Sequence, residues 1–254
     1  MSAAHEAAVV AQFGPRARAY VDSAVHAQGV DLDRLDEIVR DIRPERALDL
    51  GAGGGHVAYL LARHAAAVTA CDLSSEMLAA VAATARDRGL NNIRTAQGAA
   101  EKLPFGDAVF DFLATRYSAH HWRDFEAGLR EARRVVKPGA RAVFMDAYAP
   151  AAALFDTHLQ AIELLRDTSH GRDYSVAEWV GGLGRAGFAV LSVQISRLRI
   201  DFPSWIARMR TSEENVRAIR ALQNAAAAET KAHFAIEADG SFQLDTLLAD
   251  TVAT

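Results

Sequence analysis

The sequence contains a single cysteine, Cys71, among its 254 residues. One thiol excludes an internal disulfide framework and any metal site that is built from several thiolates. Lysine is also scarce, since only three of the 28 Lys and Arg residues are lysines, and we attribute this to compositional bias.

Long apolar runs are missing as well. No stretch offers the roughly 18 uncharged apolar residues that a membrane span needs, and the N-terminus lacks the basic start and apolar stretch of a signal peptide. Together with the single thiol, these absences predict a cytoplasmic protein without a membrane span.

An excess of positive charge is absent too. The chain has 28 Lys and Arg against 32 Asp and Glu, which gives a formal net charge of -4. A non-specific nucleic-acid binder needs a basic field that displaces phosphate counterions. We therefore expect a small-molecule partner and no nucleic acid.

What the chain does contain is enough apolar material for a substantial core, because half of its residues are hydrophobic and 24% are charged. Short apolar runs alternate with helical periodicity from residue 46 to 144, which is typical of β-α units around a parallel sheet. The predicted strands in this part are 47–50, 67–71, 92–95, 109–114 and 140–145. Farther along we expect helices at 153–166 and 176–186, a strand near 188–195, a helical stretch over 204–235 and a last strand at 245–252.

Glycines dominate the loop after the first predicted strand. Gly51, Gly53 and Gly55 stand between a strand and a helix, where they allow a sharp turn and let a ligand approach bare amides at the helix N-terminus. Asp72 follows at the end of the next strand, where an acidic side chain can accept both hydroxyls of a ribose. The combination predicts a nucleotide-type ligand.

The spacing of this loop narrows the choice of nucleotide. A dinucleotide fingerprint requires glycine at the position of His56, and the Gly-Lys-Ser/Thr of a P-loop is absent. The pattern is G-x-G-x-G, with Asp49 two residues before the first glycine. It resembles the class I S-adenosylmethionine-dependent methyltransferases.

The resemblance extends past the loop. The segment 97–105, followed by Phe110-Asp111, is similar to the adenine-side segment of that family, and 134–140 resembles its turn into the fifth strand. The chain is thereby similar to the methyltransferase type 11 group, which includes ubiquinone and menaquinone biosynthesis C-methyltransferases. The likeness is strong over 46–146, and a looser likeness points to a bacterial subgroup without assigned substrates.

The resemblance implies an α/β fold, a Rossmann-like three-layer sandwich. Its seven-stranded sheet would be mostly parallel with an antiparallel last strand, and a helical insertion would be added. A single domain over 1–254 would comprise an N-terminal helical lid (1–45), a cofactor-binding core (46–146) and a part that completes the sheet and adds substrate-side helices (147–254). The oligomeric state, monomer or homodimer, stays open.

The resemblance also implies S-adenosylmethionine as cofactor and S-adenosylhomocysteine as product. Asp49 would reach the methionine ammonium, Asp72 would hold the ribose, and Arg116 would lie beside the sulfonium. The implied cofactor contacts are Tyr20, Asp49, Gly51, Ala52, Gly53, His56, Asp72, Leu73, Met77, Ala99, Ala100, Glu101 and Arg116. Many relatives carry Asp at the position of Ala99, so only backbone or packing contact is expected there.

Candidates for chemistry follow the fourth predicted strand. Methyl transfer from a sulfonium needs alignment and a nucleophile with a free lone pair, and a histidine is the ordinary base near neutral pH. Tyr117, His120 and His121 are the catalytic candidates, although the histidines of such a loop can instead cap or pack. No metal-binding spacing is present, so no metal is expected.

The sequence therefore predicts transfer of a methyl group from S-adenosylmethionine to a small-molecule acceptor. Three alternatives stay open: an RNA methyltransferase, a protein that binds the cofactor without catalysis, and a nicotinamide-dependent oxidoreductase.

Overall fold

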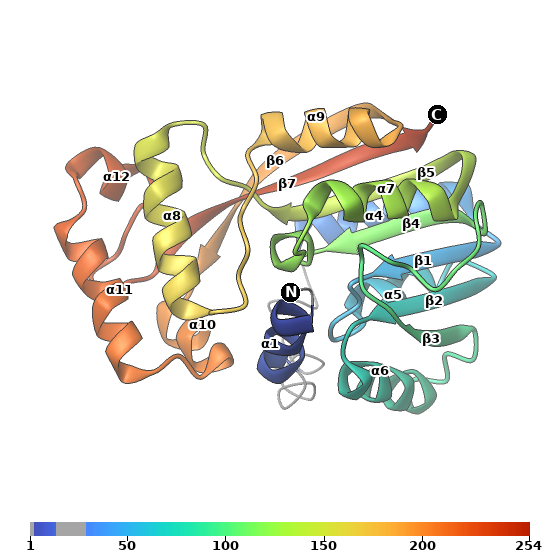
Figure 1. Cartoon of the computed structure of the whole chain (residues 1–254), viewed down its shortest axis with the longest axis horizontal. Helices are drawn as coiled ribbons and strands as arrows, with labels where there is room; N and C mark the ends of the chain where they lie inside the picture. The colour runs from blue at the N-terminus through green and yellow to red at the C-terminus, as the bar shows by residue number, and fades with distance from the viewer. Residues whose placement is uncertain (1–2, 14–28) are drawn as a thin grey trace.

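A computed structural model of the chain describes residues 3–13 and 29–254. Within these residues seven strands form one sheet in the order β3-β2-β1-β4-β5-β7-β6 (Figure 1). The strands are β1 (Arg46–Leu50), β2 (Ala67–Asp72), β3 (Ile93–Gln97), β4 (Phe110–Arg116), β5 (Val136–Ala147), β6 (Phe188–Ile200) and β7 (Phe242–Ala253). Strands β1 to β5 pair in parallel, and β7 runs antiparallel to both β5 and β6. The predicted mostly parallel sheet with a reversed last strand is confirmed.

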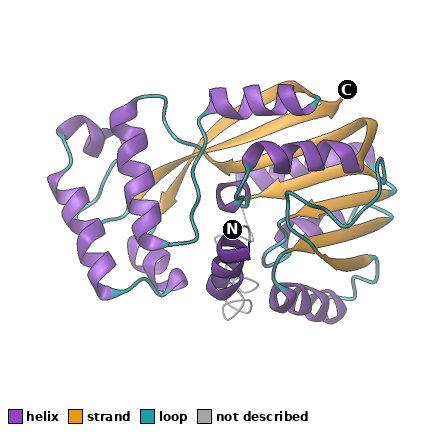
Figure 2. Ribbon diagram, in the orientation of Figure 1, coloured by secondary structure: helices purple, strands orange, loops and turns teal. Residues whose placement is uncertain are grey.

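Helices cover both faces of the sheet (Figure 2). One face packs against α4 (Val30–Ile42), α5 (His56–Leu61) and α6 (Ser75–Asp87), and the other against α7 (Phe125–Val135) and α9 (Val176–Ala186). The helices bury one stripe each. In α7, for example, Phe125, Leu129 and Ala132 are buried at helical spacing, as an amphipathic helix on a core requires.

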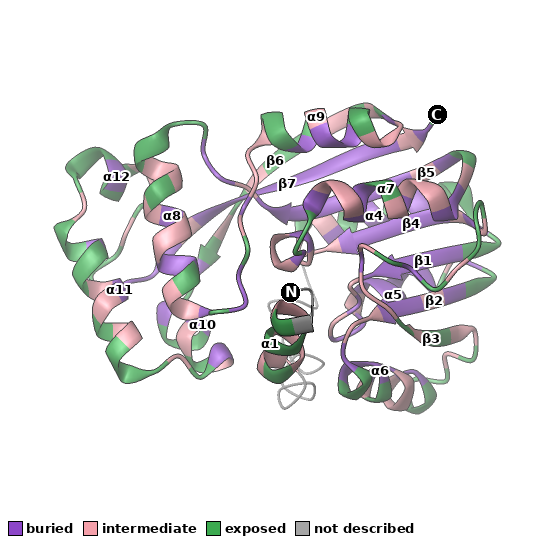
Figure 3. Cartoon of the chain, in the orientation of Figure 1, coloured by how far each residue is buried: buried purple, intermediate pink, exposed green. Residues whose placement is uncertain are grey.

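A second group of helices lies beyond the sheet proper. It consists of α8 (Ala153–Arg166), α10 (Phe202–Met209), α11 (Glu213–Ala225) and α12 (Ala228–His233). These helices pack around the protruding ends of β6 and β7 (Figures 1 and 3). Trp205, Phe234 and Phe242 belong to the buried apolar cluster that they form. In Figure 1, α1 (Ala3–Phe13) lies between this helical group and the α/β core.

Three strands are clearly longer than the sequence predicts, and one of them, β7, begins at Phe242 and not at residue 245. Strand β6 continues past residue 195 to Ile200 because its last residues pair with Phe242–Thr246 of β7. Strand β5 begins at Val136 and not at residue 140, since Val136 already pairs with Phe110. The next pair joins Phe112 to Arg141, so the residues between Val136 and Arg141 form a bulge that sequence reasoning reads as a simple turn.

The carboxyl ends of the parallel strands are covered by two short elements. These are α1 (Ala3–Phe13) and the 3₁₀ helix η2 (Ala119–His121), which follows β4. Among the helices of the described residues, none is long and apolar enough to cross a membrane.

The N-terminus of α9 is stabilised by a capping box, whose contribution to the stability of the chain can be measured. The Ser175 hydroxyl accepts from the Glu178 N–H, while the Glu178 carboxylate accepts from the Ser175 N–H at 2.8 Å, which together form a capping box. Ser175→Ala should lower the free energy of unfolding by about 1 kcal/mol, measured by urea denaturation. Ser175→Thr keeps the hydroxyl and serves as control, and equal stability of the two variants would contradict the capping role.

Candidate functional site

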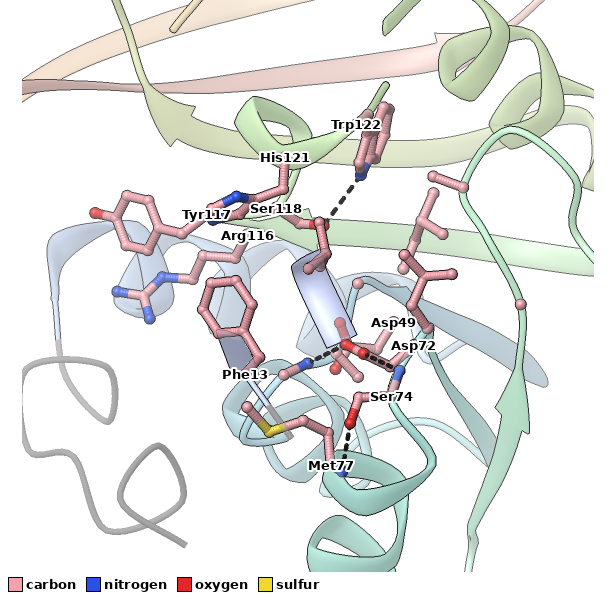
Figure 4. A pocket seen from close by; sticks show the side chains of 18 of the residues that line it. Phe13, Asp49, Asp72, Ser74, Met77, Arg116, Tyr117, Ser118, His121 and Trp122 are labelled. Atoms are coloured by element: carbon pink, nitrogen blue, oxygen red, sulfur yellow. Dashed lines mark hydrogen bonds between the residues drawn. The ribbon is translucent and has the colours of Figure 1, made fainter. Parts of the chain in front are cut away.

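The carboxyl ends of β1, β2 and β4 open onto a cleft (Figure 4). Ligands of open α/β sheets bind at this end of the strands. The predicted site residues that line the cleft are Asp49, Gly51, Ala52, Gly53, His56, Asp72, Leu73, Met77, Ala100, Glu101, Arg116, Tyr117 and His121. Within the described part of the chain the lining also includes Gly98 but leaves out Ala99 and His120. Tyr20 lies outside the described residues.

The first two glycines of the loop have different structural roles. Both have positive φ, 73° at Gly51 and 47° at Gly53, where other residues are strained. A Cβ on Gly51 would lie 1.9 Å from the Ser118 hydroxyl oxygen, so this glycine is required by packing. A Cβ on Gly53 would meet nothing within 4 Å, so at Gly53 the bare backbone faces open space.

Asp72 connects the end of β2 to the glycine loop. One of its carboxylate oxygens accepts from the Gly53 N–H at 2.8 Å and the other from the Ser74 N–H at 2.9 Å, as the dashed lines of Figure 4 show. Burial raises the pKa of Asp72, and these two hydrogen bonds oppose the rise. Each carboxylate oxygen keeps a second lone pair, so the group can still accept from the hydroxyls of a ligand.

Asp49 lies under the cleft and is only 1% exposed. Its carboxylate accepts from the Ala58 N–H in α5 at 2.9 Å. Burial raises the pKa of Asp49 to about 8; the hydrogen bond from Ala58 opposes this, and the charge of Asp72 adds to it. A cation bound in the cleft would favour the ionised form of this carboxyl.

Arg116 and Tyr117 form the wall that continues from β4. The Arg116 guanidinium binds Asp31 at the start of α4 through two contacts, of 2.5 and 3.1 Å, and lies 4.7 Å above the Tyr117 ring. Tyr117 has a positive φ of 50°, a strained conformation that is common at functional sites. Burial first, and the charge of Asp31 next, raise the pKa of the Tyr117 phenol. Tyr117 therefore stays protonated at neutral pH and suits donation of a hydrogen bond.

Helix α1 contributes residues to the cleft that sequence reasoning missed. His5, Val9 and Phe13 line it, as does Glu6. The Phe13 ring lies edge-on to His121, with 4.9 Å between ring centroids, and His5 Nε2 lies 2.9 Å from the His121 carbonyl oxygen. The spacing of four residues places His5, Val9 and Phe13 on one helical face, and that was the available signal.

Three further missed residues of the cleft lining follow β4, namely Ser118, Trp122 and Arg123. The Trp122 indole N–H donates to the Ser118 hydroxyl at 3.1 Å. Their positions, two, six and seven residues after the end of β4, made them accessible to prediction, because the segment that follows a parallel strand forms the ligand side.

The two adjacent histidines have different surroundings. His121 lines the cleft, whereas His120 points to Asp146 at the end of β5, with 2.6 Å between His120 Nδ1 and the carboxylate. The two imidazole rings are 4.2 Å apart, centroid to centroid. Among the described residues, no group of three or more His, Cys, Asp or Glu side chains is placed to hold a metal ion.

Comparison with known proteins gives three kinds of match. The family model of the methyltransferase domain matches residues 48–144. The uncharacterized methyltransferase YcgJ of Bacillus subtilis is 34% identical over 224 residues, which cover 88% of both chains. The uncharacterized protein YafE of Escherichia coli is 44% identical over 200 residues, which cover 79% of this chain and 97% of YafE.

Solved structures agree with the sequence matches. The crystal structure of the Bacillus subtilis YcgJ protein superposes with a TM-score of 0.84 at 32% identity and covers 88% of this chain and 97% of that one. A putative methyltransferase from Bacillus halodurans gives the same TM-score at 29% identity and covers 88% and 99%.

Proposed function

Because the chain belongs to the methyltransferase domain family, we propose that it transfers a methyl group from S-adenosylmethionine to a small-molecule acceptor. The single observation that carries the proposal is the arrangement of Gly53 and Asp72 on one cleft. When bound, S-adenosylmethionine supplies a methyl group on a sulfonium sulfur, which a nucleophile can displace.

The residues of the cleft offer suitable partners for each part of this cofactor. Asp72 presents acceptors at the end of β2 for the ribose hydroxyls, and Leu73 and Met77 flank the adenine. Ala100 and Glu101 lie on the adenine side, and Ala99 contributes only backbone or packing there.

The methionine end has its own set of contacts. The open space in front of Gly53, together with Gly51 and Ala52, receives the methionine part. Asp49 faces the ammonium, His56 lies near the carboxylate, and Arg116 lies at the sulfonium end. Tyr20 remains a proposed lid contact.

The charge of the whole chain supports a small-molecule acceptor over an RNA. The formal net charge of -4 opposes binding of a polyanion.

Calorimetric titration of the full chain with S-adenosylhomocysteine tests the proposal. We expect saturable binding at one site, together with no binding of NADH and no salt-sensitive binding of tRNA. Absence of S-adenosylhomocysteine binding would overturn the proposed cofactor, and salt-sensitive tRNA binding would replace the small-molecule acceptor with RNA.

The affinity for S-adenosylhomocysteine should depend on pH through Asp49. The pKa of this carboxyl is raised to about 8, and a ligand ammonium favours its ionised form, so binding releases a proton below that pH. We expect the affinity to rise by up to about tenfold per pH unit toward pH 8 and then to level off. Calorimetry in buffers of different ionisation enthalpy measures the released proton.

Asp49→Asn should weaken binding and remove its pH dependence. The control is Asp41→Asn, since the Asp41 side chain is 80% exposed on α4 and should change neither quantity. An affinity that stays constant across this pH range in the unaltered chain would exclude Asp49 as the partner of the ammonium.

A further inference from the structure

We infer that His121 is the general base of the proposed methyl transfer, held in the required tautomer and charge state by Ser169, Asp167 and the His120–Asp146 pair, and that the acceptor is a protic nucleophile. The inference rests on the proposed function. It assigns the role of base to His121 and that of a positioning residue to His120. It also excludes acceptors that have no proton to lose.

The hydrogen bond of His121 to Ser169 fixes its tautomer. His121 Nδ1 lies 3.2 Å from the Ser169 carbonyl oxygen, which can only accept, so Nδ1 carries the ring proton. In the neutral ring Nε2 then presents a lone pair. This ring belongs to the lining of the cleft, beside Tyr117 and Phe13 in Figure 4.

Asp167 stands opposite that lone pair. His121 Nε2 and the Asp167 Oδ2 atom are 4.0 Å apart, and Asp167 is 1% exposed. Oδ2 is buried and has no hydrogen-bond partner among the residues that the structure describes, whereas Oδ1 accepts from the Ser169 N–H and hydroxyl. The lone pair of His121 Nε2 and the Asp167 carboxylate are both acceptors, so there is room for one proton between them. When Nε2 takes up that proton, the imidazolium that forms lies beside the negative charge of Asp167.

His120 and Asp146 form a charged pair that influences the charge state of His121. The Asp146 carboxylate accepts from the N–H groups of Ala119 and Ala147, both at 2.9 Å, and from His120 Nδ1. Burial lowers the pKa of His120, but the charge and hydrogen bond of Asp146 outweigh it and raise this pKa to about 9. The pair therefore holds an imidazolium at neutral pH, 4.2 Å from the His121 ring.

The surroundings of His121 keep its lone pair free. Burial first, and the charge of His120 next, lower the pKa of His121, so the ring is neutral at neutral pH; the charge of Asp167 opposes this fall and stabilises the imidazolium that forms when the ring takes up a proton. The titratable groups that face it are His120 of η2, Asp146 of β5, Asp167 and His170 of the segment after α8, and His5 of α1. That segment is attached to η2, because the Gly171 and Arg172 N–H groups donate to the His120 carbonyl at 2.7 and 3.2 Å.

The chemical step balances with these groups alone. The acceptor's proton passes to His121 Nε2 while the electron pair that it leaves forms the bond to the methyl carbon. The carbon–sulfur bond breaks, and its electron pair stays on sulfur. S-adenosylhomocysteine, the methylated acceptor and a His121 imidazolium beside Asp167 result, and the proton then leaves to solvent. A phenol, an enol or another acid with its proton on oxygen, nitrogen or activated carbon fits this step; a tertiary amine or thioether does not need it.

Nitrogen-15 NMR of the histidine rings tests the assignment without any acceptor. In the full chain with S-adenosylhomocysteine, we expect at neutral pH a neutral His121 with its proton on Nδ1 and a doubly protonated His120. His120→Gln and His121→Gln assign the signals. Asp146→Asn should leave His120 neutral and raise the pKa of His121, whereas His64→Gln, half-buried beside Asp36, should change neither. A His121 that is charged, or protonated on Nε2, overturns the inference.

The products test the acceptor class. The chain is incubated with methyl-tritiated S-adenosylmethionine and small metabolites extracted from Escherichia coli. The labelled product should gain CH₂ without a new fixed charge, and its formation should fall by about 100-fold or more in His121→Gln. A sulfonium or quaternary ammonium product would contradict a protic acceptor. If no labelled product forms, the nitrogen-15 NMR of the His121 ring decides whether the inference stands. Loss of S-adenosylhomocysteine binding in calorimetry instead contradicts the proposed function.

Discussion

A Gly53→Arg substitution should abolish binding of S-adenosylhomocysteine while the chain remains folded. A Cβ at this position meets nothing within 4 Å, so the added side chain extends into the cleft where the methionine part is proposed to bind. We expect the dissociation constant to rise by about 1,000-fold or more, which corresponds to about 4 kcal/mol. Calorimetry measures the affinity, and urea denaturation measures the free energy of unfolding.

Gly53→Ala is the matched control for the backbone. Any non-glycine residue at a φ of 47° costs roughly 1–2 kcal/mol of stability, and alanine introduces this cost with little added volume. The alanine variant should bind almost as tightly as the unaltered chain. Equal affinity of the arginine variant would show that the ligand does not occupy this part of the cleft, and equal loss in both variants would assign the effect to the backbone.

The fold was predictable because its signals are local in the sequence. The strand, the glycine turn and the helix between residues 46 and 61 follow one another, and Asp72 ends the next strand. These features place their own side chains at the carboxyl edge of the sheet, so the sequence alone predicts that the glycine loop and Asp72 share one cleft.

The rest of the site depends on contacts between distant segments. Asp31 reaches Arg116 across 85 residues, and Asp146 reaches His120 across 26. The hydrophobic periodicity of the sequence predicts helices and strands, but it does not predict side-chain pairs between distant segments. The sequence could place two histidines after β4, but only the packing of the segment after α8 distinguishes the ring beside Asp167 from the ring beside Asp146. The sequence predicted an N-terminal helical lid over 1–45, but it did not single out the cleft face of α1, which has only three residues at helical spacing, His5, Val9 and Phe13.

Asp146→Asn should lower the free energy of unfolding by about 3–5 kcal/mol near neutral pH. Breaking a buried ion pair from one side costs this much, because the remaining partner loses its compensation. Asp146 is 1% exposed, and its carboxylate accepts from two backbone N–H groups as well as from His120. An asparagine presents an NH₂ group to at least one of these donors. Urea denaturation of the unaltered chain and of Asp146→Asn measures the difference in the free energy of unfolding.

That difference should itself depend on pH, and the sign follows from His120. Its pKa in the folded chain is raised from 6.5 to about 9, so the stabilisation by the pair is complete below pH 6.5 and is lost as the pH rises through about 9. The gap between the unaltered chain and Asp146→Asn should therefore narrow over this window without closing, because the loss at the two backbone N–H groups does not titrate. A gap that widens with rising pH would contradict a charged His120, and with it the charge state on which the assignment of His121 as the base depends.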